Sequence, residues 1–317
     1  MSPSACLEYS PFLQENDRPA APAFSCLPDF PRVKRQLVSF EAGGIFMVFE
    51  GKTAIITGGA SGIGKALAKA FLAEGTQVVL CDMNPDTLSA TAAELNCHHV
   101  VCNVTDEDAI RSLVAETCER FGAIDIFCSN AGLARGEPDH AASADNAIWQ
   151  ACFDVHVMAQ VYAARAVLPA MIERGEGYLV NMASAAGLLS QIGDAAYSAT
   201  KHASVGFSES LAITHADDGI RVSVVCPQYV ATPLTGYRDG EEAGSTSGTI
   251  SADQAARTIV EGMKRGDFMI LTHPEVEGYF QNKAGDYNRW ISGMRKLRKS
   301  IIEKTGSTRL EDMHKHM

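Results

Sequence analysis

The sequence predicts an α/β fold, in which a doubly wound parallel sheet of about seven strands carries helices on both faces. A glycine turn at 57–64 lies between an apolar run, 53–56, and an alanine-rich amphipathic segment, 65–73. Further short apolar runs alternate with segments of helical spacing, and runs that are apolar throughout are typical of strands buried on both faces. The chain has 317 residues, 46% of them hydrophobic, which is enough for one large Rossmann-type core.

The glycine turn reads Thr-Gly-Gly-Ala-Ser-Gly-Ile-Gly and predicts a dinucleotide site. Glycines let the backbone approach a diphosphate, and the N–H groups that open the following helix face its negative charge. Gly59 to Lys65 also matches most of a nucleotide triphosphatase loop, but Ala66 stands where that loop needs a hydroxyl for magnesium. A turn that merely joins a strand to a helix remains the plain alternative.

The second strand, 77–81, ends in Asp82, and a helix is expected at 86–95. An acid at the end of this strand can bond both hydroxyls of the adenosine ribose and would repel a 2′-phosphate. No Arg or Lys follows it at 83–84, and position 61 is Ser. NAD is therefore favoured over NADP, with a solvated turn aspartate as the alternative.

Three more strands and their helices follow in order. Strand 99–102 leads to Asn103 and Val104, and the helix at 106–121 is capped by Asp106 or Thr105. Strand 124–128 runs into Asn130-Ala131-Gly132. A long alanine-rich helical stretch, 147–174, is expected to break near Pro169. Strand 178–182 then ends beside Ser184.

The remaining elements complete the sheet. A helix reaching about position 215 contains Tyr197 and Lys201, and strand 220–226 closes on Pro227. The polar, glycine-rich segment 236–248 suits a mobile substrate lid. A capping box at 251–254 opens another helix, and 268–271 is the last strand.

Tyr197 and Lys201 are four residues apart and so share one helix face. Tyr279 and Lys283 repeat this spacing but have no strand-end serine before them. Hydride transfer from a secondary alcohol requires loss of the hydroxyl proton, and tyrosine with a pKa near 10 is a poor base at neutral pH. A neighbouring lysine stabilises the phenolate. Ser184 can hold the substrate oxygen while Tyr197 exchanges the proton.

The ordered motifs from about Val48 to Leu271 resemble the short-chain dehydrogenase/reductase family, whose members show T-G-x-x-x-G-x-G and a Ser-Tyr-Lys set. The resemblance implies that Ser184, Tyr197 and Lys201 are catalytic and that Lys201 also bonds the nicotinamide ribose. It implies that Thr232 contacts the nicotinamide carboxamide. The full set of cofactor-binding residues that it implies is Gly58, Ser61, Gly62, Ile63, Gly64, Asp82, Asn103, Val104, Asn130, Ala131, Gly132, Tyr197, Lys201, Pro227, Val230 and Thr232.

Two residues depart from the family pattern. Gln228 stands where a Pro-Gly pair has its glycine, which puts in doubt how closely the backbone can pass the nicotinamide. His156 stands where members usually carry an Asn that holds a water linking the lysine to solvent. We expect His156 to be a fourth catalytic residue that keeps this proton relay, titrating near pH 6.5. A core histidine bonded to the backbone is the alternative.

Composition limits the function classes. The formal net charge is -11, and no dense Lys/Arg stripe accompanies the core, so nucleic acid is not an expected partner. The nine cysteines include no C-x-x-C pair, which indicates reduced, mostly buried thiols of a cytoplasmic protein. The histidine pairs lack other clustered ligands, so no metal site is predicted.

The ends of the chain differ from its centre. Residues 1–46 hold six of the twelve prolines and predict a disordered extension without a signal or transit peptide. Met47 directly precedes the folded region, so an over-long gene start is an open explanation. The NAD-binding catalytic domain is expected at 47–272, and 273–317 as a basic amphipathic helical extension that packs on the domain or on a partner. No apolar run long enough to span a bilayer is seen.

The sequence thus predicts an NAD-dependent oxidoreductase that interconverts a secondary alcohol and a ketone. An aromatic C-terminal segment favours a bulky hydrophobic substrate. A catalytically silent NAD(H)-binding regulator and an NADP-linked carbonyl reductase are the alternatives. The small-residue faces at 159–170 and 203–212 predict a homodimer or homotetramer.

Overall fold

The computed structural model describes residues 47–137, 139–241 and 248–309. Its central sheet has seven strands in the order β3-β2-β1-β4-β5-β6-β9, and all neighbours are parallel. This confirms the predicted fold class. The strands are β1 (Thr53–Thr57), β2 (Gln77–Asp82), β3 (His98–Val101), β4 (Ile126–Ser129), β5 (Gly177–Met182), β6 (Ile220–Val225) and β9 (Met269–Ile270). A separate parallel pair joins β7 (Val230–Ala231) to β8 (Ile250–Ser251).

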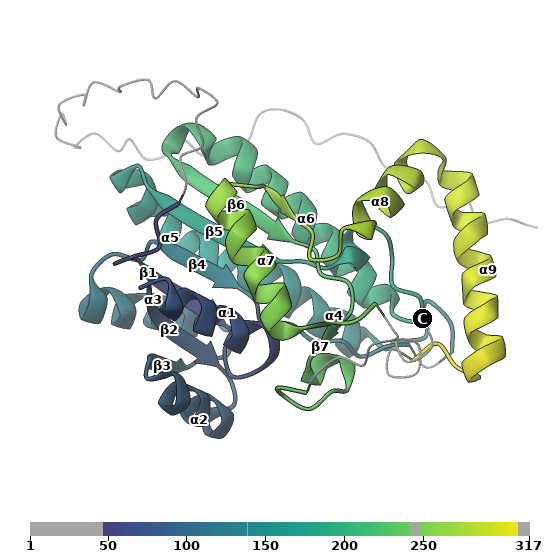
Figure 1. Ribbon diagram of the computed structural model, residues 1–317, viewed down its shortest axis with the longest axis horizontal. Helices are drawn as coiled ribbons and strands as arrows, with labels where there is room; N and C mark the ends of the chain where they lie inside the picture. The colour runs from purple at the N-terminus through teal and green to yellow at the C-terminus, as the bar shows by residue number, and fades with distance from the viewer. Residues whose placement is uncertain (1–46, 138, 242–247, 310–317) are drawn as a thin grey trace, which may run out of the picture. The chain divides into compact units, whose positions relative to one another are not determined.

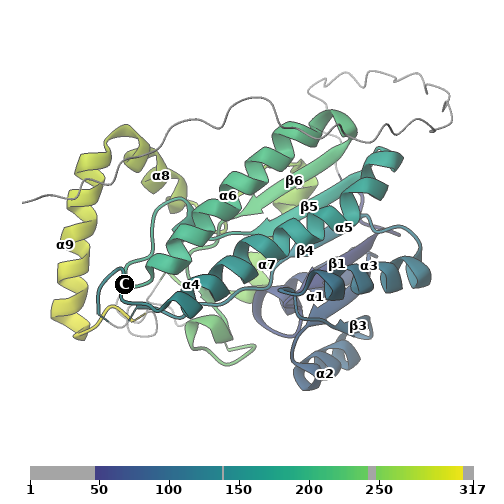
Figure 2. The same ribbon diagram turned by 180° about the vertical axis from the view of Figure 1, so that it is seen from behind.

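Helices cover both faces of the sheet. One core cluster packs α1, α2 and α7 against it, with Phe71, Leu88 and Ile259 buried. The other packs α3, α5 and α6, and Figures 1 and 2 show the two faces in turn. The helices are α1 (Gly62–Ala73), α2 (Pro85–Leu95), α3 (Glu107–Phe121), α4 (Asn146–Phe153), α5 (Ala159–Arg174), α6 (Ala195–His215), α7 (Ala252–Arg265), α8 (Glu275–Gly285) and α9 (Tyr287–Thr305).

The prediction of a helix break near Pro169 is wrong. Pro169 lies inside α5 and is exposed, so the backbone carbonyl that loses its hydrogen bond can be hydrated. The irregularity lies directly after α4 instead, where Asp154–Met158 form a π-helical turn that contains His156. Such turns often occur at functional sites.

The helical stretch Asn146–Arg174 also corrects the expectation about membrane spans. By length and composition it could cross a bilayer, with a mean hydropathy of 1.3 over its most apolar window. Its Ala163, Val167 and Met171 are buried against the sheet, as in the core helix of a Rossmann-type domain.

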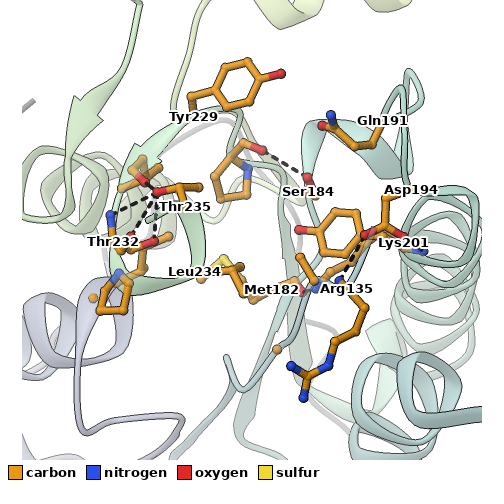
Figure 3. Close-up of a pocket in the computed structure, with 18 of the residues that line it drawn as sticks. Arg135, Met182, Ser184, Gln191, Asp194, Lys201, Tyr229, Thr232, Leu234 and Thr235 are labelled. Atoms are coloured by element: carbon orange, nitrogen blue, oxygen red, sulfur yellow. Dashed lines mark hydrogen bonds between the residues drawn. The ribbon is translucent and has the colours of Figure 1, made fainter. Parts of the chain in front are cut away.

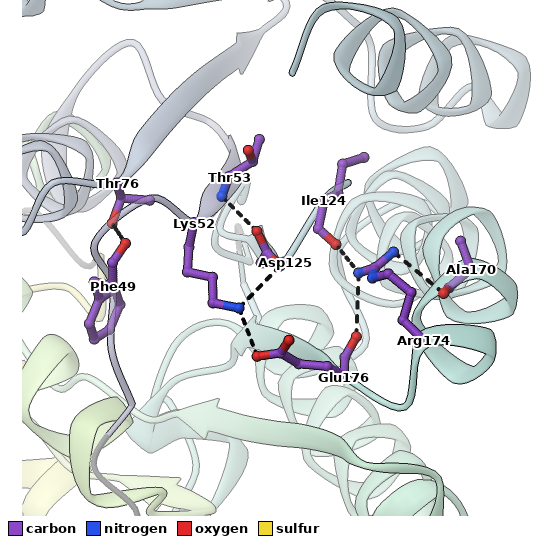
Figure 4. A network of polar contacts seen from close by, with 9 residues as sticks. All are labelled: Phe49, Lys52, Thr53, Thr76, Ile124, Asp125, Ala170, Arg174 and Glu176. Carbon is purple, nitrogen blue, oxygen red and sulfur yellow. Dashed lines mark hydrogen bonds and ion pairs between the residues drawn. The ribbon is translucent and has the colours of Figure 1, made fainter. Parts of the chain in front are cut away.

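A polar network joins the sheet at the amino ends of its strands. Asp125 Oδ2 accepts a hydrogen bond from Thr53 N at 2.9 Å, and Lys52 Nζ reaches Asp125 Oδ1 at 3.5 Å and Glu176 Oε1 at 2.7 Å. Arg174 donates to Ile124 O at 2.7 Å (Figure 4). These contacts link the starts of β1, β4 and β5. They lie at the end of the sheet opposite the ligand-binding end, since ligands bind at the carboxyl ends of the strands in such folds.

Several predicted segments fall partly or wholly outside the described residues. The proline-rich extension, 1–46, lies outside them, as do 242–247 of the proposed lid and 310–317 of the C-terminal extension. Within the described part, α8 and α9 form the extension. Val276 of α8 is fully buried in a cluster with Leu188 and Val205, which precede it in the chain.

Candidate active site

A cavity of about 700 Å³ opens at the carboxyl ends of β1 and β4. The strand order runs outward in opposite directions from this pair, which makes it the topological switch point where such folds bind their ligands. The predicted residues that line the cavity are Gly58, Ser61, Gly62, Ile63, Asp82, Asn130, Ala131, Gly132, Ser184, Tyr197, Lys201, Pro227, Val230 and Thr232. Four predicted site residues do not line it: Gly64, Asn103, Val104 and His156.

The glycine turn is packed too closely for side chains. A Cβ on Gly64 would lie 2.2 Å from Gly58 O, and Gly58 itself has a φ of +63°. Gly64 therefore shapes the turn from outside the cavity. At the start of α1, Gly62 N donates to Asp239 Oδ1 at 2.8 Å. A carboxylate of the chain itself thus occupies the helix N-terminus, as expected for an anion-binding position.

Asn130 fastens this turn to β4. Its Nδ2 donates to Thr57 O at 2.9 Å and to Gly58 O at 3.1 Å. The N–H groups of Asn130 and Ala131 both donate to Thr57 Oγ1. Asn130 and Ala131 therefore hold the glycine turn in place, and both also line the cavity.

Asp82 places a carboxylate at the edge of the cavity. Its Oδ2 accepts from Ala60 N at 3.3 Å and its Oδ1 from Asn84 N at 3.1 Å. Among the described residues it forms no ion pair, so no cation stands beside it to hold a 2′-phosphate. Asn103, by contrast, is exposed, and its Oδ1 accepts from the N–H and the Oγ1 of Thr105.

Ser184, Tyr197 and Lys201 converge at the end of β5. Lys201 is buried, and its Nζ donates to Met182 O at 2.8 Å and lies 5.5 Å from the Tyr197 ring centroid. Ser184 Oγ donates to Pro227 O at 3.3 Å. Figure 3 shows Ser184 and Lys201 on one side of the cavity and Thr232 and Leu234 on the other.

Burial sets the proton affinities of this group. It raises the pKa of Tyr197 to about 12, against the opposing effect of its hydrogen bond with Ser184. It lowers the pKa of Lys201 to about 8, because the ammonium has left water without an acid beside it. A tyrosine and a lysine that line one cavity and whose pKa values burial moves in opposite directions are typical of a functional site.

Asp194 is a site residue that sequence reasoning missed. It caps α6 by accepting from Tyr197 N at 3.0 Å, and its other oxygen accepts from Arg135 N at 3.2 Å and Gly136 N at 2.9 Å. It thereby ties the loop after β4 to the helix that carries Tyr197. The available signal was an aspartate three residues before Tyr197, the spacing of an N-cap.

His156 is buried behind the site. Its Nε2 accepts from Leu133 N at 3.2 Å, so the ring proton lies on Nδ1, which donates to Thr200 Oγ1 at 2.8 Å. The ring meets that of Tyr197 edge-on at 5.3 Å. Burial first, and then the charge of Lys201, lower its pKa to about 2. The expectation that His156 titrates near neutral pH is therefore wrong, because burial and the Lys201 ammonium both disfavour the charged imidazolium.

We expect His156→Ala to slow alcohol oxidation roughly ten- to a hundredfold, the lower range for a group that supports proton transfer. The change removes the link between the loop at Leu133 and α6 and leaves space beside Tyr197. His156→Asn should retain most of the rate, because an amide also offers a donor and an acceptor. Wild type and the Asn variant should share one pH profile. A near-neutral inflection that disappears in the Asn variant would contradict a permanently neutral ring.

Gln228 stands where the family has a glycine, but the backbone at this position does not require one. The non-glycine residues with positive φ in the described part of the chain are Asn96 and Ser190, so Gln228 adopts an ordinary conformation. Its N–H donates to His273 Nδ1 at 3.3 Å, and His273 Nε2 donates to Tyr229 O at 3.1 Å. A second buried histidine thus fixes the backbone of this segment.

A Rossmann-type sheet whose switch point adjoins a Ser-Tyr-Lys set defines a class of nicotinamide-dependent oxidoreductases. Comparison with known families supports this class. The family model of the short chain dehydrogenases matches residues 52–243, and the chain belongs to that family. Among curated relatives, it is 33% identical over 254 residues to 1-deoxy-11-beta-hydroxypentalenate dehydrogenase of Streptomyces avermitilis, covering 78% of this chain and 93% of the relative. It is 34% identical over 218 residues to 3beta-hydroxysteroid dehydrogenase 2 of Eggerthella lenta, covering 67% and 84%.

Solved structures show the same family. A short chain dehydrogenase/reductase from Burkholderia phymatum in complex with NAD superposes with a TM-score of 0.70 at 27% identity, covering 76% of this chain and 96% of that one. Together, the family and its named relatives identify the chain as an oxidoreductase that acts on hydroxyl groups.

Proposed function

We propose that the protein is an NAD-dependent dehydrogenase that oxidises a bulky, mainly apolar secondary alcohol, or reduces the corresponding ketone. The convergence of Ser184, Tyr197 and Lys201 on one cavity supports this proposal most directly. We place the enzyme in the cytoplasm, because the seven cysteines in the described part of the chain are all free.

Tyr197 is the proposed base. Its burial favours the neutral phenol, so the phenolate needs a nearby positive charge, and the Lys201 ammonium is placed to supply it. A hydrogen bond from its Nζ to Met182 O, at 2.8 Å, supports Lys201 in this position. The proton that leaves the alcohol then passes to the Tyr197 oxygen.

Ser184 is the proposed orienting group. Its Oγ lies among buried residues, where a hydrogen bond to the substrate oxygen would not compete with bulk water. The hydroxyl now donates to Pro227 O and can rotate toward a ligand oxygen. This would hold the reacting carbon in place beside Tyr197.

The residues present fit a dinucleotide. The start of α1 already holds an anionic group, the Asp239 carboxylate, at the position where a diphosphate would be held by Gly62 and Ile63. Asp82 would hold the adenosine ribose. When bound, NAD would accept the hydride that the alcohol carbon gives up.

The test of this function is also a prediction about cofactor choice. Secondary alcohols of several skeletons, including steroid, terpenoid, aromatic and aliphatic ones, are screened for formation of NADH or NADPH. We expect NAD to exceed NADP in kcat/KM by roughly one to two orders of magnitude, about 1 to 3 kcal/mol at one site. Asp82→Asn should reduce this preference, because it removes the charge that repels a 2′-phosphate.

Other results would point to the rival functions. Equal efficiency with both cofactors would contradict the role given to Asp82 and favour an NADP-linked reductase. NADH binding without turnover of any alcohol or ketone would favour a silent NAD(H)-binding regulator.

We also propose a homodimer or homotetramer formed through α5 and α6. Ile213 on α6 is 81% exposed, and the family commonly pairs these two helices across a two-fold axis. Light scattering at micromolar concentration should give a multiple of the 33.9 kDa chain. Gly206→Arg, which puts a charge on the exposed face of α6, should weaken the assembly, whereas Gly278→Arg on α8 should not. A wild-type monomer would contradict the proposal.

A further inference from the structure

A second cavity, of about 860 Å³, adjoins the catalytic one. Five residues line both, namely Ser184, Gln191, Ile192, Gln228 and Tyr229. The second cavity therefore begins at the residue that would hold the reacting oxygen. Its far walls are α8 and α9, which lie to one side of the sheet (Figures 1 and 2). We call it the C-terminal chamber.

One face of α9 forms an apolar wall of the chamber. Trp290, Gly293, Met294, Leu297 and Ile301 all line it, and their spacing of three and four residues puts them on one side of the helix. A chamber of several hundred Å³ with such a wall suits a ligand of several fused rings better than a small alcohol.

A buried lysine holds α8, the helix that precedes α9, against the catalytic domain. Lys283 of α8 is 6% exposed, and its Nζ donates to Leu188 O at 2.6 Å and to Leu189 O at 3.1 Å. It also lies 3.3 Å from His202 Nε2, on the helix that carries Tyr197. Lys283, the lysine of the second Tyr-Lys pair, therefore anchors α8 to the segment that follows Ser184. The chamber is thus held in place by buried hydrogen bonds.

Gln228 lines the boundary between the two cavities with an unmet hydrogen-bonding group. Its Oε1 is buried and has no hydrogen-bond partner among the described residues. Because His273 fixes the backbone on both sides of it, the side chain is presented from a rigid segment. A buried acceptor of this kind destabilises the protein unless something donates to it.

We propose that the C-terminal chamber binds the apolar body of the substrate and that Gln228 Oε1 accepts a hydrogen bond from a second hydroxyl group near the reacting carbon. The substrate class is then a bulky alicyclic diol. This inference rests on the proposed dehydrogenase function. The reacting hydroxyl cannot satisfy Gln228, since its proton passes to Tyr197. A second donor is required.

The chamber is tested by filling it. A Cβ on Gly293 would meet nothing within 4 Å, so Gly293→Phe can enter the chamber without a backbone clash, and the exposed neighbour Ser292→Phe is the matched control. With androstanol and cyclohexanol as probes, Gly293→Phe should raise KM for androstanol at least roughly tenfold relative to that for cyclohexanol, while Ser292→Phe changes neither. Equal effects of the two variants would overturn the chamber assignment.

A binding measurement separates this inference from the proposed function. Trp290 lines the chamber, so androstanol should quench its fluorescence, and the signal should be absent in Trp290→Phe. Quenching without turnover of any alcohol would leave the chamber standing and refute the dehydrogenase function. Turnover of cyclohexanol and androstanol without quenching would support the dehydrogenase function and refute the chamber assignment.

The role of Gln228 is tested with androstanol and a vicinal androstanediol. The wild type should favour the diol in kcat/KM roughly ten- to a hundredfold, because the mono-alcohol leaves the amide unpaired. Gln228→Met, which keeps the length and removes the acceptor, should abolish this preference and leave NADH affinity intact. If Gln228→Met lowers kcat/KM equally for both substrates, the variant has lost structure. If the wild type shows no preference for the diol, Gln228 binds only water. Either result overturns this part of the proposal.

Discussion

Replacing Tyr197 by Phe should lower turnover by a factor of roughly a hundred to ten thousand, the range that a positioned acid or base supplies. The ring and its edge-on contact with His156 remain, so the fold and the cavity walls are kept. NADH affinity should change little, because Asp82 and the glycine turn would supply it. Stopped-flow turnover and fluorescence titration with NADH measure the two quantities separately.

The direction of the pH dependence follows from the raised pKa of Tyr197. At neutral pH the phenol is mostly protonated, so alcohol oxidation should speed up with rising pH and ketone reduction should slow down. Tyr287→Phe, at an exposed position of α9, is the control and should match the wild type. If Tyr197→Phe keeps a near wild-type rate and the same pH profile, another group removes the proton.

The fold could be predicted from the sequence because its signals are local. Strands such as β1 and β5 are buried along their whole length, so most of their residues are apolar, and the glycine turn shows where the first strand meets its helix. The repeated β-α units predict that the strands are parallel, whereas their order in the sheet is seen only in the structure. The Ser-Tyr-Lys set was found for the same reason, since two of its members share one helix.

What could not be predicted depends on contacts between distant segments. His156 looked like a titrating relay because its sequence shows neither the burial nor the bond from Leu133, twenty-three positions away. The π-helical turn that places it has the composition of an ordinary helix. Likewise, Gln228 and His273 are 45 positions apart, so only the structure shows that one fixes the other.

The C-terminal extension shows the same distinction between local and distant contacts. Its aromatic and apolar residues predicted a packed helix, and the hint of a bulky substrate came from them alone. The contact of Lys283 with Leu188 O crosses 95 positions and gives that hint a physical basis. It joins α8, one wall of the chamber, to the segment that follows Ser184.

Replacing Gly64 by Ala should disrupt cofactor binding without touching the cavity. The added Cβ would lie 2.2 Å from Gly58 O and 2.6 Å from Asn130 Nδ2, distances that side-chain carbons essentially never show. The glycine turn must therefore shift, and with it the N–H groups at the start of α1. Overpacking of this kind costs about 1 to 3 kcal/mol, so NADH affinity should fall roughly ten- to a hundredfold.

Gly278→Ala separates this effect from the general effect of a methyl group. Gly278 lies in α8 with nothing within 4 Å of its Cβ, and alanine there should stabilise the helix by about 0.5 to 1 kcal/mol. Thermal unfolding should show a lower Tm for Gly64→Ala and an equal or higher one for Gly278→Ala, with NADH affinity reduced in the first alone. If Gly64→Ala binds NADH with wild-type affinity, the backbone at Gly58 can shift without cost. The close packing of Gly64 against Gly58 would then play no part in holding the dinucleotide.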